Sequence, residues 1–292
     1  MTGGIILLDK PSGMTSFDAD KIVRRATGIK KVGHSGTLDP FATGLLPVFT
    51  GDALKFMRYT DDYDKKYLCR AIFGATSDTG DRTGEIEKVK KCGADDIAAI
   101  KKALEEVASR DMQTPPKYSA KKINGRKAYE LAREGAEFDL KPNRIKVYSL
   151  DVLAEEVRED TVALDILVYC SKGTYIRTIC TDAGELSGFG AYAEELRRTM
   201  VGPFNVSDAV SPDDISEDKY IDPIVTLSDI PVVRLDEKMT KLISNGVKVR
   251  SSQIAGFDLE ADKLCRAESD GRLIAVIYKD DHDIIRVDRG FA

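Results

Sequence analysis

An alternating segment in the second half of the chain constrains its fold more than any other feature. Val162, Leu164, Ile166, Val168 and Cys170 alternate with other residues, which is the period of a strand with one buried face. The sequence SKG at 171–173 predicts a turn, and apolar residues then recur at helical spacing until Gly188, which is placed to end a helix. A helix that follows a strand this closely puts Arg177 on its first turn, where a side chain can be delivered to a site.

Other segments predict further strands and helices, so we expect an α+β protein. Residues 4–8 are typical of a buried strand that ends in a Pro-Gly turn, and a helix follows with Ser16 as its N-cap and Gly28 at its end. Lys65 to Phe73 predicts a strand that carries Tyr67 on its apolar face. Residues 97–107 predict a second helix.

The length of 292 residues favours two domains. Residues 208–222 are acidic, contain Pro212, are followed by Pro223 and show little periodicity, so we interpret them as a connector. Short strands are expected at 273–278 and 284–287, around a polar turn. We therefore predict one domain at 1–222 and a small β-rich domain at 223–292.

The net charge of −5 argues against a uniformly basic protein, but the charge is segregated. Residues 110–146 hold ten basic and five acidic side chains, whereas 208–237 hold nine acidic and two basic ones. The five cysteines are scattered, so neither a zinc site nor a disulfide framework is expected. No run of about 18 apolar residues occurs, and the only apolar run near the N-terminus is too short for a signal peptide. We expect a soluble, cytoplasmic protein.

The glycine-rich segment 33–47 holds the strongest candidate for chemistry. It places Asp39 near His34, one of only two histidines in the chain, on the kind of loop where binding and catalytic residues concentrate. The structural alternative is an Asp-Pro turn in which the carboxylate accepts backbone N–H groups.

Five motifs occur along residues 4–204 in a fixed order: LDKPSGMTS at 8–16, GHSGTLDP at 33–40 with ATG at 42–44, KKY at 65–67, SKGTYIR at 171–177 and ELRRT at 195–199. Together they resemble the TruB family of tRNA pseudouridine synthases, in its stand-alone bacterial form. The resemblance implies a pseudouridine synthase fold, in which a mixed, largely antiparallel sheet is flanked by helices and loops. It also implies a small C-terminal module of the PUA type, although few specific residues match there.

The resemblance implies that Asp39 is the nucleophile in the isomerisation of uridine 55 in the tRNA T-loop. Arg177 would pair with Asp39, and Tyr67 would stack on the target base. An Asp carboxylate is ionised at neutral pH and needs no separate base. No cofactor, metal, guide RNA or obligatory protein partner is implied, and we expect a monomer.

The remaining candidates would bind the substrate. His34 would support flipping of the target nucleotide, which costs a few kcal/mol, and Tyr175 and Leu196 would form the apolar wall. Lys10 is grouped with them, in a motif that is expected to support the catalytic loop. Residues 113–146 resemble a basic insertion that closes over the T-arm, and 78–81 resemble a family motif whose chemistry we do not assign.

Each candidate has a structural alternative: an interior histidine bonded to the backbone, core tyrosines and leucines, or a solvated basic helix face. Two other functions also remain open. One is an RNA-binding or RNA-folding factor that does not depend on catalysis. The other is a glycoside hydrolase, which usually needs a second carboxylic acid beside the nucleophile, and no such partner is evident from spacing.

Overall fold

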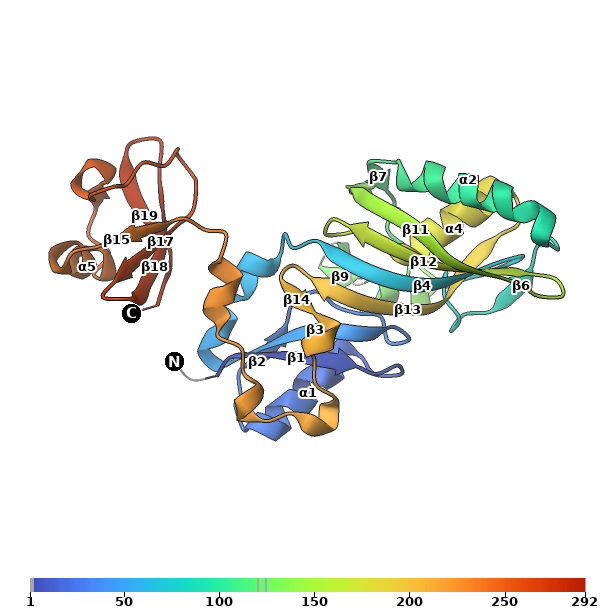
Figure 1. Ribbon diagram of the computed structural model, residues 1–292, viewed down its shortest axis with the longest axis horizontal. Coiled ribbons are helices and arrows are strands. Elements are labelled where there is room, and N and C mark those ends of the chain that lie inside the picture. The colour runs from blue at the N-terminus through green and yellow to red at the C-terminus, as the bar shows by residue number, and fades with distance from the viewer. Residues whose placement is uncertain (1–2, 120, 124, 292) are drawn as a thin grey trace. The chain divides into compact units, whose positions relative to one another are not determined.

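The computed structural model describes residues 3–119, 121–123 and 125–291. The chain divides into two compact units, Met1–Ile221 and Asp222–Ala292, which are described separately below (Figure 1).

The first unit is built on one large sheet that is mostly antiparallel. Its strand order is β1, β3, β13, β4, β12, β11, and β2 and β14 pair with β3 and β13. The pairing between β13 and β3 is parallel, at Arg197 opposite Thr43 and Arg198 opposite Gly44. This topology confirms the predicted α+β class. The strands are β1 (Ile5–Lys10), β2 (Val32–His34), β3 (Thr43–Thr50), β4 (Lys65–Phe73), β11 (Val147–Val157), β12 (Val162–Cys170), β13 (Ala191–Val201) and β14 (Phe204–Asn205).

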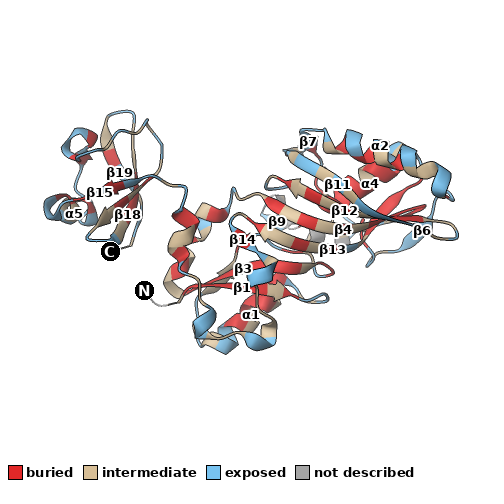
Figure 2. Cartoon of the chain, in the orientation of Figure 1, coloured by how far each residue is buried: buried red, intermediate tan, exposed pale blue. Residues whose placement is uncertain are grey.

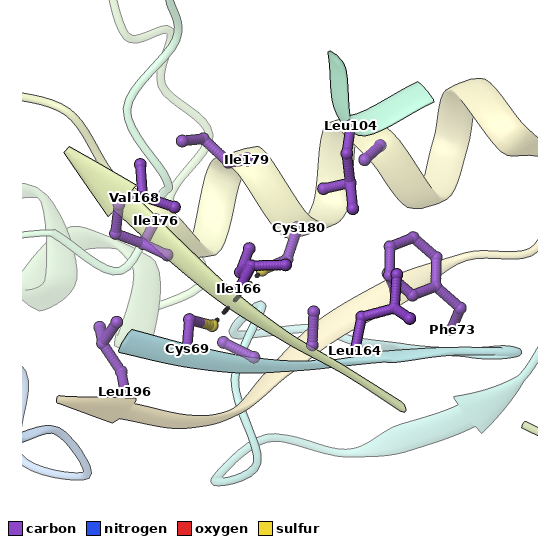
Figure 3. Close-up of a cluster of buried hydrophobic side chains, with 14 of the residues drawn as sticks. Cys69, Phe73, Leu104, Leu164, Ile166, Val168, Ile176, Ile179, Cys180 and Leu196 are labelled. Atoms are coloured by element: carbon purple, nitrogen blue, oxygen red, sulfur yellow. Dashed lines mark hydrogen bonds between the residues drawn. The ribbon is translucent and has the colours of Figure 1, made fainter. Parts of the chain in front are cut away.

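The larger hydrophobic core lies between this sheet and two helices, α2 (Ile97–Ala108) and α4 (Ile176–Ser187). Alternate residues of β4 and β12 point into it, and Cys69 Sγ lies 3.8 Å from Cys180 Sγ of α4 (Figure 3). The buried positions follow the inner faces of strands and helices (Figure 2). The predicted strands and helices of this region are confirmed, because their side-chain periodicity matches the face that they bury.

Helix α1 (Ser16–Thr27) packs against β1 and β3 over a smaller core. Its N-cap is Thr15, whose Oγ1 accepts a hydrogen bond from the backbone N–H of Asp18, and Gly28 ends it in the left-handed conformation. The prediction of Ser16 as the cap is wrong by one residue. The Ser16 hydroxyl instead accepts from the Leu38 N–H and donates to the Leu38 carbonyl, so it ties α1 to the loop that carries Asp39.

Residues 208–221 are part of the first unit, so their interpretation as a connector is wrong. The Val210 N–H donates to the Leu7 carbonyl and the Asp9 N–H to the Val210 carbonyl, while Ile5 and Ile221 exchange two hydrogen bonds. The segment therefore covers the free edge of β1, which would otherwise expose unpaired backbone groups. It lacks periodicity because it pairs through single bridges between short 3₁₀ turns, η3 (Val206–Asp208), η4 (Pro212–Asp214) and η5 (Glu217–Lys219).

Shorter elements lie between the main strands. They are η1 (Gly51–Thr60), the hairpin of β5 (Ala75–Ser77) and β6 (Ile86–Lys88), η2 (Ala94–Asp96), β7 (Met112–Gln113) paired with β10 (Asn143–Arg144), the hairpin of β8 (Lys122–Ile123) and β9 (Arg126–Lys127), and α3 (Ala128–Arg133).

The second unit is a small β-rich domain with its own core. Its five strands are ordered β15, β17, β18, β19, β16, and the helix α5 (Glu237–Ser244) packs on them. The two predicted strands are present as β18 (Arg272–Lys279) and β19 (Ile284–Gly290). The other elements are η6 (Pro223–Leu227), β15 (Val232–Arg234), β16 (Val249–Arg250), η7 (Ser251–Gln253) and β17 (Cys265–Ser269).

Candidate active site

A cavity of about 680 Å³ opens in the first unit where the loop after β2 meets the start of β4, the end of β13 and the turn before α4. Five predicted site residues line it: Asp39, Tyr67, Tyr175, Arg177 and Leu196. They come from four separate segments of the chain. The fold therefore brings together most of the residues that the sequence singled out.

Asp39 and Arg177 form an ion pair at this cavity. Arg177 Nε lies 2.9 Å from Asp39 Oδ2, and the side chain of Asp39 is 33% exposed whereas that of Arg177 is 3% exposed. Protein surrounding the carboxylate excludes water and raises the pKa of Asp39, while the charge of Arg177 lowers that pKa again. The buried guanidinium thus opposes the effect of burial and favours the charged form of the carboxylate.

The other nitrogens of Arg177 bind the surrounding backbone. Nη1 donates to the Thr79 carbonyl and Nη2 to the Tyr118 carbonyl, both at 2.8 Å. Nη1 also lies 3.5 Å from Oδ2 of Asp81. Because the guanidinium is held on several sides, its Nε–H is aimed at Asp39 before any substrate binds.

Asp81 is a site residue whose role the sequence did not reveal. It is buried in the loop between β5 and β6, where its Oδ1 accepts from the Thr79 hydroxyl and from the Thr83 N–H. It belongs to the 78–81 motif, which was the only signal for it. Its negative charge raises the pKa of Asp39 and balances part of the charge of Arg177.

Tyr67 and Leu196 form the apolar wall of the cavity. They lie on the neighbouring strands β4 and β13, and both are buried. Burial raises the pKa of the Tyr67 hydroxyl, and Arg198, which hydrogen-bonds to it, lowers that pKa again. Tyr175 stands at the start of α4, and its backbone is held at both N–H and carbonyl by the Gln113 side chain.

Arg198 is a second residue that the sequence did not single out, although it lies in the ELRRT motif. Its side chain is almost fully buried and lines the cavity. Nε donates to the Leu45 carbonyl at 2.8 Å and Nη2 to the Gly36 carbonyl at 2.7 Å. Gly36 has a φ of +71°, and a Cβ there would lie 3.2 Å from Nη1 of Arg198, so the loop approaches this guanidinium closely.

Among the described residues, Lys10 and His34 do not line the cavity. Lys10 is fully buried, and its Nζ donates to the carbonyls of Pro11, Met14 and Pro40. This burial lowers the pKa of Lys10 to about 8. Lys10 therefore supports the loop that carries Asp39 and does not face the cavity, which corrects its place among the substrate-binding candidates.

His34 lies beside the loop with both ring nitrogens engaged. Nδ1 is 2.9 Å from Asp20 Oδ2 and Nε2 is 3.2 Å from Thr37 Oγ1. Its side chain is 17% exposed. The structure thus places it against the loop that carries Asp39, and its role in nucleotide flipping stays a prediction.

Comparison with solved structures identifies the fold. The crystal structure of a Cbf5-Nop10-Gar1 complex matches with a TM-score of 0.71 and 22% identity, over 99% of this chain and 85% of that one. An H/ACA RNP bound to a substrate RNA containing 2'-deoxyuridine matches with a TM-score of 0.70, also at 22% identity. These two likenesses show which fold the chain has.

Sequence comparison then identifies the family. Residues 24–176 match the TruB family pseudouridylate synthase N-terminal domain, and 177–227 match the tRNA pseudouridylate synthase B C-terminal domain. Proteins named tRNA pseudouridine synthase B are 34% identical in Clostridium tetani, over 94% of this chain and 95% of that protein, and 35% identical in Clostridium perfringens strain SM101, over 98% of each. The chain belongs to the TruB family of pseudouridine synthases and is an isomerase.

Two further features are absent from the described residues, 3–119, 121–123 and 125–291. No group of three or more His, Cys, Asp or Glu side chains in that part of the chain is arranged to hold a metal ion. None of the helices described above combines the length and the apolar character that crossing a membrane requires.

Proposed function

We propose that this enzyme converts uridine 55 in the T-loop of tRNA to pseudouridine, with Asp39 as nucleophile and without cofactor or guide RNA. The observation that carries the proposal is the accessible Asp39 carboxylate held by the buried Arg177 at a cavity with an apolar wall. The relatives named tRNA pseudouridine synthase B support tRNA as the substrate.

The proposed reaction is an isomerisation, so substrate and product have the same composition. The bond between ribose C1′ and uracil N1 breaks, the uracil turns, and a bond forms between C1′ and C5. The proton on C5 leaves and N1 gains a proton. Asp39 supplies the transient covalent bond to the substrate, Arg177 keeps its carboxylate ionised, and Tyr67 and Leu196 hold the uracil ring between apolar surfaces.

The target uridine must leave its stack in the folded T-arm before Asp39 can reach it. Arg144 and Lys172 lie at the cavity and suit the phosphates of an extruded nucleotide. We further propose that residues 113–146 bind the T-arm backbone, that 1–222 form the catalytic domain and that 223–292 act as a PUA-like RNA-binding domain. The enzyme would act as a cytoplasmic monomer.

Hydrolysis of a glycosidic bond is less well supported by the geometry. Asp81 is the second acid near Asp39, but its carboxylate accepts from Thr79 and Thr83 and faces Arg177. A general acid must be protonated and must reach the leaving group. The carboxylate of Asp81 is engaged by these donors and by Arg177, so it is not placed to protonate a leaving group.

A single-turnover assay on a T-arm stem-loop tests the proposal. Asp39→Asn should abolish pseudouridine formation, because an amide is not a nucleophile of comparable strength, and should change the dissociation constant of the RNA less than about threefold. Asp18→Asn, an exposed position on α1, is the matched control and should act at the normal rate.

Normal product formation by Asp39→Asn would contradict the assignment of Asp39 as the nucleophile. Loss of RNA binding together with loss of product, in a variant that remains folded, would instead favour a role of this loop in RNA binding or RNA folding.

A further inference from the structure

A hydrogen-bonded series of three side chains leads from the interior of the first unit to the wall of the cavity. Asp20 on α1 contacts His34 at the end of β2, with 2.9 Å between Oδ2 and Nδ1, and His34 contacts Thr37, with 3.2 Å between Nε2 and Oγ1. Thr37 lines the cavity, two positions before Asp39. The series therefore ends where the proposed substrate would bind.

For a neutral His34 ring, the chemistry of these groups determines where the protons lie. A carboxylate offers only acceptors, so the hydrogen bond to Asp20 places a proton on Nδ1 of His34. In the neutral ring Nε2 is then an acceptor, and the Thr37 hydroxyl donates its only proton to it. The lone pairs of Oγ1 that remain can only accept hydrogen bonds.

Asp20 is held in this place at a cost to stability. Its side chain is 6% exposed, and its second oxygen, Oδ1, is buried without a hydrogen-bond partner among the described residues. A buried acceptor without a partner destabilises the folded state. Asp20 occupies this position despite that cost, and its other oxygen binds His34. This arrangement suits a role in positioning His34.

We propose that Asp20 and His34 are positioning residues that make the Thr37 hydroxyl a fixed hydrogen-bond acceptor for a donor group of the target nucleotide. This inference rests on the proposed function, because it takes a uridine nucleotide as the occupant of the cavity. Uridine offers two donors of this kind, the ribose 2′-hydroxyl and the imide N3–H, and the experiment separates them.

The experiment is a double-mutant cycle between the protein and the RNA. Dissociation constants are measured for the T-arm stem-loop with uridine, 2′-deoxyuridine or N3-methyluridine at the target position, using wild type and Thr37→Val. Thr37→Val should weaken binding of the uridine RNA about fivefold, which is the effect of one neutral hydrogen bond. On the RNA that lacks the correct donor, the same substitution should change binding less than twofold.

Three protein variants complete the test. Thr37→Ser keeps the hydroxyl and should bind like wild type, and Asp20→Ala should reproduce part of the Thr37→Val loss on the uridine RNA alone. The matched control is Thr27→Val, which removes a hydroxyl that donates to the Val23 carbonyl within the same helix as Asp20; it should leave RNA binding unchanged. Circular dichroism checks that each variant is folded, and the Thr37 variants decide the outcome if Asp20→Ala does not fold.

Equal losses from Thr37→Val on all three RNAs would overturn the inference, because the hydroxyl would then contact no donor of the target nucleotide. Pseudouridine formation by wild type is measured in parallel on the uridine RNA. If wild type forms the product while the losses are equal, this inference fails and the proposed function stands. If wild type neither forms the product nor binds the RNA, both fail.

Discussion

Arg177 Nε lies 2.9 Å from Asp39 Oδ2, and this contact joins the first turn of α4 to the loop after β2. The buried guanidinium also binds two backbone carbonyls and faces Asp81. It therefore orients the carboxylate and at the same time ties together three segments of the first unit. Activity and local order should depend on the same side chain.

Arg177→Lys should lower the single-turnover rate about 100- to 1,000-fold. A lysine carries the charge on one nitrogen and cannot reach Asp39 and both carbonyls together, so Asp39 would lose its orientation. Arg197→Lys is the control, because Arg197 binds Asp9 in a half-exposed pair outside this cavity. Similar losses in the two variants would show that replacing any paired arginine of the first unit has this effect.

The rate should fall on acidification at a pH above the ordinary titration range of an aspartate. Burial raises the pKa of Asp39, so the carboxylate takes up a proton, and loses its nucleophilic form, at a higher pH than a solvated one. Arg177→Gln removes the charge that opposes this shift, and the acidic limb should move to still higher pH. Single-turnover rates between pH 4.5 and 8 measure the acidic limb of the pH–rate profile for wild type and for Arg177→Gln. The same acidic limb in the two proteins would contradict the electrostatic role of Arg177.

Arg198→Met should destabilise the first unit by about 1–3 kcal/mol. The substitution leaves the buried carbonyl of Leu45 without its donor, which costs that amount, whereas the carbonyl of the exposed Gly36 can bind water instead. Scanning calorimetry should show a melting temperature lower by several degrees. The exposed Arg286→Met, which breaks a surface pair with Asp280, should change stability by less than about 0.5 kcal/mol.

Gly44→Ala should be far more destabilising than Gly13→Ala. Both glycines have positive φ, +100° and +84°, so both substitutions carry a backbone penalty of about 1–2 kcal/mol. A Cβ at Gly44 would lie 2.3 Å from the Arg198 carbonyl oxygen, whereas nothing lies within 4 Å of one at Gly13. Urea unfolding measures the difference, and equal losses would show that β3 and β13 can separate without cost.

The sequence by itself determined the elements whose side chains repeat at a regular spacing. The strands β4 and β12 and the helices α2 and α4 have the bounds and buried faces that their apolar periodicity predicts. That spacing is local, because a strand or helix buries whichever of its faces is apolar. The sequence also indicated the motif around Asp39, because this motif and four others occur in the order that carries the family resemblance.

The tertiary structure alone decided which polar side chains meet. Arg198 and Asp81 lie at the site, and Lys10 binds the backbone of the loop that carries Asp39. Residues 208–221 pair with the edge of β1. No local spacing encodes these contacts, because each joins segments that are distant in the chain. A buried charge is stable only where the packed fold supplies a partner, and that partner is known only once the fold has brought the segments together.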